Sequence, residues 1–143
     1  MTSLNRLSHS SRMAEERLCQ TSAMKVRFAR HTARLDAIVE FYRDDVGLPV
    51  IGEFRDHAGY DGVFIDLPGT GAHLEFTSGG AHSAPQPDPE SLVVLYVDDD
   101  AELDRIAARL AGREVTPSNP YWQANAKAFI DPDGFQVLLT IAP

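Results

Sequence analysis

The sequence contains an internal repeat, and this repeat limits the folds that the chain can adopt. Three short segments recur in the same order, with offsets of 65, 68 and 63 residues. The matching segments are 64–66 with 129–131 (FID in both), 33–36 with 101–104 (ARLD and AELD), and 74–77 with 137–140 (LEFT and VLLT). Because the order is kept and the offsets drift by only five residues, the chain is predicted to fold as two copies of one structural unit.

Each copy has the pattern of one strand, one helix and three further strands. In the first copy, Val26 and Phe28 alternate with charged residues, as in a half-buried strand. A helix then follows between a possible cap at Thr32 and a terminating Gly47. The remaining strands of the first copy are predicted at 49–54, 62–67 and 72–77. The second copy has strands predicted at 91–97, 125–131 and 135–141, with its helix following Asp99 or Asp100 and ending at Gly112. The sequence therefore predicts an α+β fold of two βαβββ modules, whose curved sheets form a common cleft.

The modules are predicted at 24–79 and 91–142, within a single domain over 24–142. Between them lies the segment 78–90, rich in Gly, Pro and Ser, which we interpret as a linker. The segment 131–134 (DPDG) lacks the further ligands of a calcium loop and is predicted to be a turn. Residues 1–23 are rich in Ser and lack a periodic apolar pattern, so we expect a flexible tail, or Met24 as the true initiator.

Composition narrows the possible partners and the cell compartment. With 143 residues and 43% hydrophobic residues, the chain can form one compact domain. Its formal charge of −8 and its pI of about 4.9 argue against binding to nucleic acid. No apolar run is long enough for a membrane span. The single cysteine, Cys19, excludes a disulfide framework and favours a cytoplasmic protein.

Three motifs resemble one superfamily. They are FYRDDVGLPV at 41–50, HLEFT at 73–77 and FIDPDGFQVLL at 129–139. Together with the paired βαβββ pattern, they resemble the vicinal oxygen chelate superfamily, which includes glyoxalase I, extradiol dioxygenases and bleomycin-resistance proteins. The stretch NPYW at 119–122 is also similar to uncharacterised bacterial glyoxalase-like proteins. The resemblance implies a ligand cleft and leaves the particular activity open.

The resemblance also implies where a metal would be bound. Metal-using members take one ligand from each of strands one, four, five and eight. Here Glu75 falls at the strand-four position, but Leu92 and Leu138 fall at the positions on strands five and eight. The strand-one position falls near Met24 or Arg27, depending on the alignment. We therefore expect no metal and no other cofactor. The alternative is a divalent metal at a different site, a facial triad built from Glu75 and two imidazoles among His31, His57 and His73.

Glu75 is the central candidate residue of the site. A glutamate on a short strand is either solvated or placed to contact something, and inside a cleft it needs a partner such as Arg27 or Arg30. With a pKa raised by burial it could act as a catalytic base. The aromatic pair of NPYW could stack on a ligand, or could cap the core or a dimer contact. The residues expected to bind a ligand are His31, Tyr60, Phe64, His73, Tyr121 and Trp122.

The function expected from these features is the binding of a small organic molecule in the cleft, without the usual metal of the superfamily. The alternative is an enzyme, either a lyase or isomerase with Glu75 as base or a metal-dependent lyase, isomerase or dioxygenase with a non-standard site. A homodimer is a further possibility, and no nucleic acid or membrane partner is expected.

Overall fold

The computed structural model describes residues 24–142. The predicted tail over 1–23, with Cys19, lies outside this range. Within the described range, no helix is long and apolar enough to cross a membrane.

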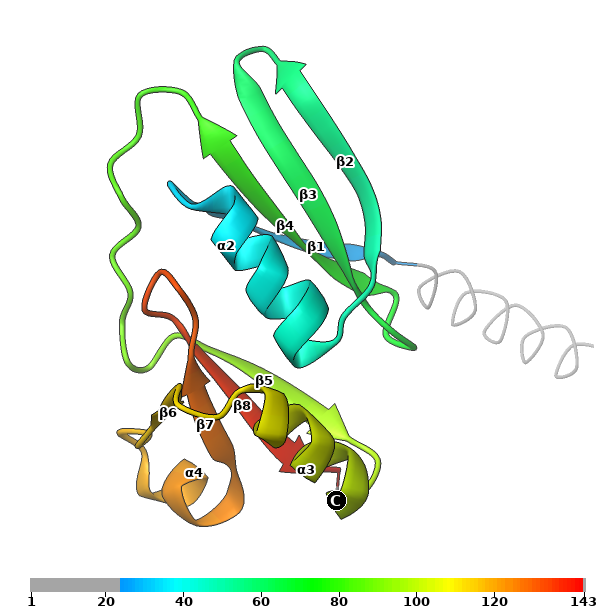
Figure 1. Cartoon of the computed structure of the whole chain (residues 1–143), viewed down its shortest axis with the longest axis vertical. Helices are drawn as coiled ribbons and strands as arrows, with labels where there is room; N and C mark the ends of the chain where they lie inside the picture. Colours follow the sequence, from blue (N-terminus) through cyan, green and yellow to red (C-terminus); the bar gives the residue numbers. More distant parts are fainter. Residues whose placement is uncertain (1–23, 143) are drawn as a thin grey trace, which may run out of the picture.

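The first module is a four-stranded sheet with a helix across one face (Figure 1). Its strands are β1 (Val26–His31), β2 (Val50–His57), β3 (Tyr60–Leu67) and β4 (Ala72–Gly79), in the order β1-β4-β3-β2. The strand β1 runs parallel to β4, and the other pairs are antiparallel. The parallel pair requires the crossover that the helix between β1 and β2 provides.

The second module repeats this topology. Its strands are β5 (Leu92–Val97), β6 (Glu114–Val115), β7 (Lys127–Ile130) and β8 (Gln136–Ile141), in the order β5-β8-β7-β6. The edge strand β5 is again parallel to the last strand, β8. Helix α3 (Asp100–Arg109) follows β5, and the short helix α4 (Pro120–Asn125) lies between β6 and β7. The predicted α+β fold of two βαβββ modules is therefore confirmed, and the two sheets remain open rather than closing into a barrel.

The first helix begins as α2 (Leu35–Val39) and continues as the π-helical stretch η1 (Glu40–Val46). The Thr32 hydroxyl accepts a hydrogen bond from the backbone N–H of Arg34 at 2.9 Å. The N-cap residue is Arg34, however, and no side chain caps this helix, so the predicted cap at Thr32 lies two residues too early. Gly47 ends the helix in the left-handed region, with φ of 92°. The apolar residues of this helix are buried against the sheet, and they include Leu35, Ile38, Val39, Phe41, Tyr42 and Val46.

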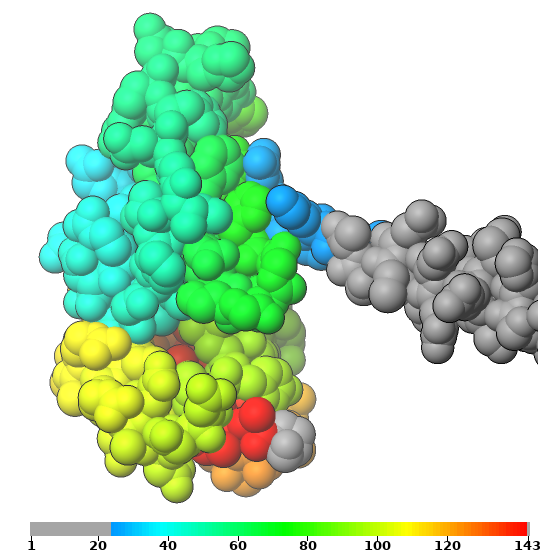
Figure 2. All heavy atoms as spheres, turned by 90° about the vertical axis from the view of Figure 1, so that its right-hand side faces the viewer, coloured from blue at the N-terminus to red at the C-terminus, as the bar shows by residue number. Residues whose placement is uncertain are grey.

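One continuous core joins the two modules. Buried side chains of β3, β4, the first helix, α3, β7 and β8 form a single cluster. In Figure 2 the first helix, in cyan, rests directly on α3, in yellow. Arg109 at the end of α3 donates to the carbonyl oxygens of Asp45 and Val46 at 2.8 and 3.2 Å. The last carbonyl groups of a helix have no partner within the helix. Arg109 of the second module therefore provides the hydrogen bonds that cap the end of the first helix.

The structure corrects three local predictions. The strand β2 extends to His57, because it pairs with Tyr60 across a tight turn in which Ala58 has a positive φ of 52°. The short strand β6 was not predicted, because two residues are too few to show an alternation of apolar and polar side chains. The helix α4 was also missed. Asn119 is extended, as expected before a proline, but its side chain accepts from the N–H of Tyr121 at 2.9 Å and Pro120 begins a helix.

Candidate functional site

The two faces of the first sheet have different chemistry. On β4, Leu74 and Phe76 are buried among the core residues under the helix. His73, Glu75 and Thr77 alternate with them and therefore point to the opposite side of the sheet, which we call the Glu75 face. In Figure 1 the helix lies in front of this sheet, so the Glu75 face is turned to the back. The Glu75 face thus carries polar side chains on β4, which lies between β1 and β3 in the sheet.

Glu75 is paired with an arginine and is not a solvated strand residue. Its side chain is only 11% exposed, and its Oε2 lies 3.2 Å from Nη1 of Arg27 on β1. Of the two arginines considered as partners, Arg27 is therefore the correct one. Arg30 lies three residues further along β1 and points to the other face. The Arg27 side chain is 52% exposed, so the pair lies at the boundary between the protein and solvent.

His73 completes this cluster. Nε of Arg27 donates to Nε2 of His73 at 3.0 Å. A guanidinium can only donate, so Nε2 of His73 is the acceptor in this contact. His73 and Glu75 thus have a common partner, Arg27, on one face of the sheet.

Two phenylalanines form a floor beside the cluster. The Arg27 guanidinium lies 4.7 Å from the ring centroid of Phe64, and the ring of Phe54 follows at 5.8 Å from Phe64. A Cβ on Gly62 would overlap the Phe54 ring, and a Cβ on Gly52 would come within 3.1 Å of Phe64. The glycines thus allow both rings to lie on the backbone of a neighbouring strand. Phe64 was predicted as a site residue, whereas Phe54 was missed although its strand position was correctly predicted.

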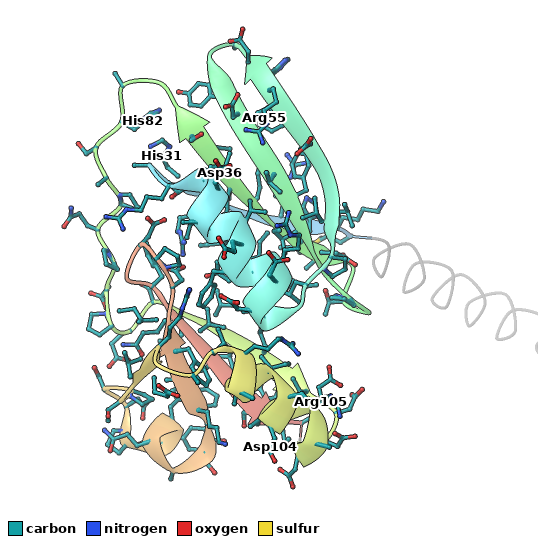
Figure 3. The ribbon with its side chains drawn as sticks, in the orientation of Figure 1. His31, Asp36, Arg55, His82, Asp104 and Arg105 are labelled. Carbon is teal, nitrogen blue, oxygen red and sulfur yellow. The ribbon has the colours of Figure 1, made fainter. Side chains whose placement is uncertain are left out.

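Three further candidates lie at one end of the sheet. The imidazoles of His31 and His82 have ring centroids 5.0 Å apart, and they lie side by side in Figure 3. The hydroxyl of Tyr60 forms a hydrogen bond of 2.7 Å with Nε2 of His82. His31 and Tyr60 were expected near a ligand, and the structure brings them together through His82. His82 was not recognised from the sequence, because it lies in the segment interpreted as a linker.

The second module has an apolar residue at the position equivalent to Glu75. Glu75 is opposite Ala29 in the parallel pair of the first sheet, and Leu138 is opposite Val94 in that of the second. Leu138 is fully buried, although it points away from the face that carries Val137 and Leu139. The second module therefore has no carboxylate to match Glu75.

The aromatic pair of NPYW belongs to the second module. The hydroxyl of Thr140, on the Leu138 side of β8, donates to the carbonyl of Asn125 at the end of α4 at 2.6 Å. The helix α4 therefore lies over this side of the second sheet. The rings of Tyr121 and Trp122 contact each other edge to face, with centroids 4.9 Å apart. No ring contact, ion pair or side-chain hydrogen bond described for residues 24–142 joins them to the Glu75 face, so the prediction that Glu75 and Trp122 line one cleft stays a prediction.

The residues at the superfamily's metal positions do not fit a metal. Glu75 is the one ligand type among them, and its carboxylate faces the Arg27 guanidinium. Leu92 and Leu138 supply no donor atom. For the alternative site, no group of three or more His, Cys, Asp or Glu residues within 24–142 is close enough to hold a metal ion. His31 contacts His82, while His73 contacts Arg27.

A second buried carboxylate lies at the DPDG turn. The Asp131 side chain is fully buried, and its Oδ2 lies 2.7 Å from Nη2 of Arg30 and 2.7 Å from the hydroxyl of Tyr42. Its Oδ1 accepts from the backbone N–H groups of Asp133 and Phe135 at 2.9 and 3.1 Å. Burial, and then the Asp131 charge, raise the pKa of Tyr42 well above its ordinary value. The phenol is therefore a permanent donor, and the cluster joins the two modules. Sequence reasoning recognised the turn but not this partnership.

The fold and these motifs define a class of protein. The paired βαβββ modules are those of glyoxalase-like proteins, and solved structures of this class superimpose on the chain. Glyoxalase I of Leishmania major matches with a TM-score of 0.62 at 18% identity, over 82% of this chain and 86% of that one. TnmS3, an antibiotic binding protein from Streptomyces sp. CB03234, matches with a TM-score of 0.60 at 18% identity, over 84% and 96%. At these identities the likeness shows the fold alone.

The chain belongs to the YycE-like family. Models of the YycE-like N-terminal and C-terminal domains match residues 26–77 and 90–140. The YycE protein of Bacillus subtilis strain 168, which is described as uncharacterized, is 42% identical over 127 residues, covering 86% of this chain and 91% of its own length. Its crystal structure, described as that of a candidate glyoxalase or fosfomycin resistance protein, matches with a TM-score of 0.78 over 85% of this chain and 91% of that one.

Proposed function

We propose that this protein binds a small organic molecule on the Glu75 face, without the divalent metal used elsewhere in its superfamily. The observation that carries the proposal is the burial of Glu75 with one half-exposed arginine as its partner. A buried carboxylate destabilises the fold unless it is paired, and a purely structural role is served as well by an apolar residue. Leu138 is such a residue in the second module.

The geometry leaves the cluster able to accept a ligand. Arg27 uses Nε for His73 and Nη1 for Glu75, and it remains open to solvent on the other side. A carboxylate has about four acceptor positions, and one guanidinium does not fill them. A ligand with polar groups can therefore bind to both Arg27 and Glu75. This favours binding over catalysis, because Glu75 acts as the base of a lyase or isomerase only after it has been released from Arg27.

A second copy of the chain is the partner that we propose. The edge strand β1 exposes Val26 and Phe28 to 54% and 61%, and Met24 before it to 77%. On β5, the other edge, Tyr96 is 58% exposed. Such apolar side chains at two open sheet edges support an interface between copies. Phe28→Asp should then shift the protein to monomers in light scattering after gel filtration. A wild-type protein that is monomeric at high concentration would contradict this.

A fragment screen by ligand-observed NMR tests the binding proposal. Fragments that bind the wild-type protein should bind Glu75→Gln about 10- to 100-fold more weakly, the range of one charge-assisted hydrogen bond. Glu53→Gln is the matched control, since Glu53 is 61% exposed on β2. A screen in which every hit binds both variants equally would exclude the Glu75 face as the site.

Elemental analysis tests the metal-free part of the proposal. The protein, purified without a chelator, should contain far less than one zinc, nickel or iron per chain. A metal close to one per chain that is lost in Glu75→Gln would overturn the metal-free proposal and favour the metal-dependent enzyme.

A further inference from the structure

One end of the Glu75 face carries three side chains that can bind a metal ion. His31 is opposite Thr77 in the pairing of β1 with β4, and Tyr60 is opposite Gly79 in the pairing of β3 with β4, so both point to the Glu75 face. His82, from the segment that follows β4, contacts both of them (Figure 3). Two imidazoles and one phenol from three separate segments therefore meet at this end of the face.

The distances within this cluster agree with three ligands of one ion. The Tyr60 oxygen lies 2.7 Å from Nε2 of His82, which is the distance of a hydrogen bond when no ion is bound. Two ligand atoms at about 2.0–2.1 Å from one ion and at about a right angle are about 2.9 Å apart. The ring centroids of His31 and His82 are 5.0 Å apart. Two imidazoles that bind one ion at an angle of about 90–109° have centroids about 4.5–5.2 Å apart.

Gly80 makes the contact between Tyr60 and His82 possible. A Cβ at this position would lie 2.7 Å from the Tyr60 oxygen and 3.0 Å from Cδ2 of His82. The residue also has a positive φ of 65°, a conformation that favours glycine. A side chain at this position would therefore displace one of the two groups, so their close approach depends on the glycine.

An ion can reach the cluster from solvent. His82 is exposed, and His31 and Tyr60 are half-buried. Whereas Nε2 of His73 accepts from Arg27, the ring and hydrogen-bond contacts described for His82 within 24–142 are with Tyr60 and His31. No guanidinium thus competes with an ion for the His82 ring in this part of the chain.

We propose that His31, His82 and Tyr60 form a binding site for a divalent transition metal ion, with Cu²⁺ as the preferred ion. Imidazole nitrogens suit copper, nickel and zinc, and sites of nitrogen and oxygen ligands bind Cu²⁺ most tightly among these ions. The imidazoles bind through unprotonated nitrogens, and the Tyr60 phenol releases its proton to the solvent when it binds. The site uses neither Glu75 nor the superfamily's metal positions, so the inference goes beyond the proposed function. With three ligands from the protein and the remaining positions open to water, the ion exchanges with the buffer, and protein purified without added copper is expected to contain little of it.

A titration of the full-length protein with Cu²⁺ tests the site. In a buffer that competes weakly for copper, one ion per chain should bind, with an EPR signal from nitrogen ligands and a phenolate-to-copper charge-transfer band in visible absorption. His31→Gln and His82→Gln should each weaken binding at least about tenfold, since even the loss of an outer-shell partner costs about 10- to 100-fold in metal affinity. Tyr60→Phe should abolish the charge-transfer band while the nitrogen signal remains, a change that the loss of a merely structural hydrogen bond would not cause.

Two matched variants control for the other histidines. His57→Gln removes an exposed imidazole of β2, and His9→Gln removes the imidazole that lies outside the described residues. Both should bind Cu²⁺ like the wild-type protein and keep the charge-transfer band. Circular dichroism checks the folding of each variant. If His31→Gln fails to fold, His82→Gln decides, because His82 lies in an exposed segment outside the strands.

The outcomes separate this inference from the proposed function. Clearly less than one bound ion per chain, or a His82→Gln variant that binds Cu²⁺ as tightly as the wild-type protein, would overturn the inference and leave ligand binding on the Glu75 face standing. A charge-transfer band that persists in Tyr60→Phe would overturn it as well. Copper binding that is lost in Glu75→Gln and kept in His82→Gln would instead show a metal at Glu75, and both the inference and the metal-free proposal would fail.

Discussion

Glu75 and Asp131 both carry a buried carboxylate, and the surroundings of the two carboxylates differ. Asp131 has two side-chain donors and two backbone donors within 3.1 Å, and its side chain is inaccessible to solvent. Glu75 has one guanidinium at 3.2 Å, and that guanidinium is half-exposed. The Asp131 carboxylate has all its acceptor positions in use and joins the modules, whereas the Glu75 carboxylate retains unused acceptor capacity. Burial of a carboxylate thus indicates a binding site only when its hydrogen-bonding capacity is left incomplete.

The Asp131 region should be the most sensitive to mutation. In Asp131→Asn one of the two carboxylate oxygens becomes an NH2 group, which cannot accept, so either the donors on Oδ1 or the donors on Oδ2 lose their acceptor. Arg30 also loses the buried charge that lies 2.7 Å from it. We expect the free energy of unfolding to fall by about 3–5 kcal/mol, the cost of breaking a buried ion pair. Urea denaturation followed by circular dichroism measures this change.

Asp133→Asn is the comparison for that variant. Asp133 lies 3.5 Å from the same arginine nitrogen and makes no side-chain hydrogen bond with its Oδ2. Its loss should cost clearly less than that of Asp131. Equal effects of the two variants would show that the net charge of the turn, and not the Asp131 hydrogen bonds, stabilises the junction.

Tyr42→Phe should have an intermediate effect. It removes one buried hydrogen bond to a charged acceptor, so we expect a loss of about 1.5–3 kcal/mol in the free energy of unfolding at neutral pH. Tyr96→Phe removes an exposed phenol and should change that free energy by less than about 0.5 kcal/mol.

The pH dependence of Tyr42→Phe has a definite sign. The pKa of Tyr42 in the folded protein is raised by burial and by Asp131, so its stabilising contribution is fully present below the pKa of the unfolded chain. Above about pH 10 the unfolded state loses this proton while the folded state keeps it. The stability difference between wild type and Tyr42→Phe should therefore shrink as the pH rises beyond that value. A difference that stays constant to pH 11 would contradict the raised pKa.

Glu75→Gln should have a small effect on stability and a large effect on binding. Its partner is half-exposed, so the ion pair contributes at most about 1 kcal/mol. Thermal melts of this variant should lie close to wild type while fragment binding is lost. If Glu75→Gln instead unfolds the protein as strongly as Asp131→Asn, the two carboxylates are both structural and the contrast between them disappears.

Much of the fold was readable from the sequence because it depends on local patterns. The repeat, the alternation of the strands and the helix between Thr32 and Gly47 all reflect side chains within a few residues of each other. For Glu75 the sequence left two alternatives open, a solvated strand residue or a residue inside a cleft with a partner such as Arg27 or Arg30, and the structure decided between them. The α4 helix was not recognised, because its six residues are too few to show a helical apolar pattern.

The tertiary structure decided the partners. Arg27 and Arg30 lie on opposite faces of β1, and only the parallel register with β4 determines which of them meets Glu75. Asp131 is bound by residues 89 and 101 positions earlier in the chain, and no local pattern encodes a contact over that separation. The same holds for Phe54 over Gly62, which depends on the pairing of β2 with β3. The sequence determined which side chains face each side of a strand, and the packing of strands and modules determined which of them meet.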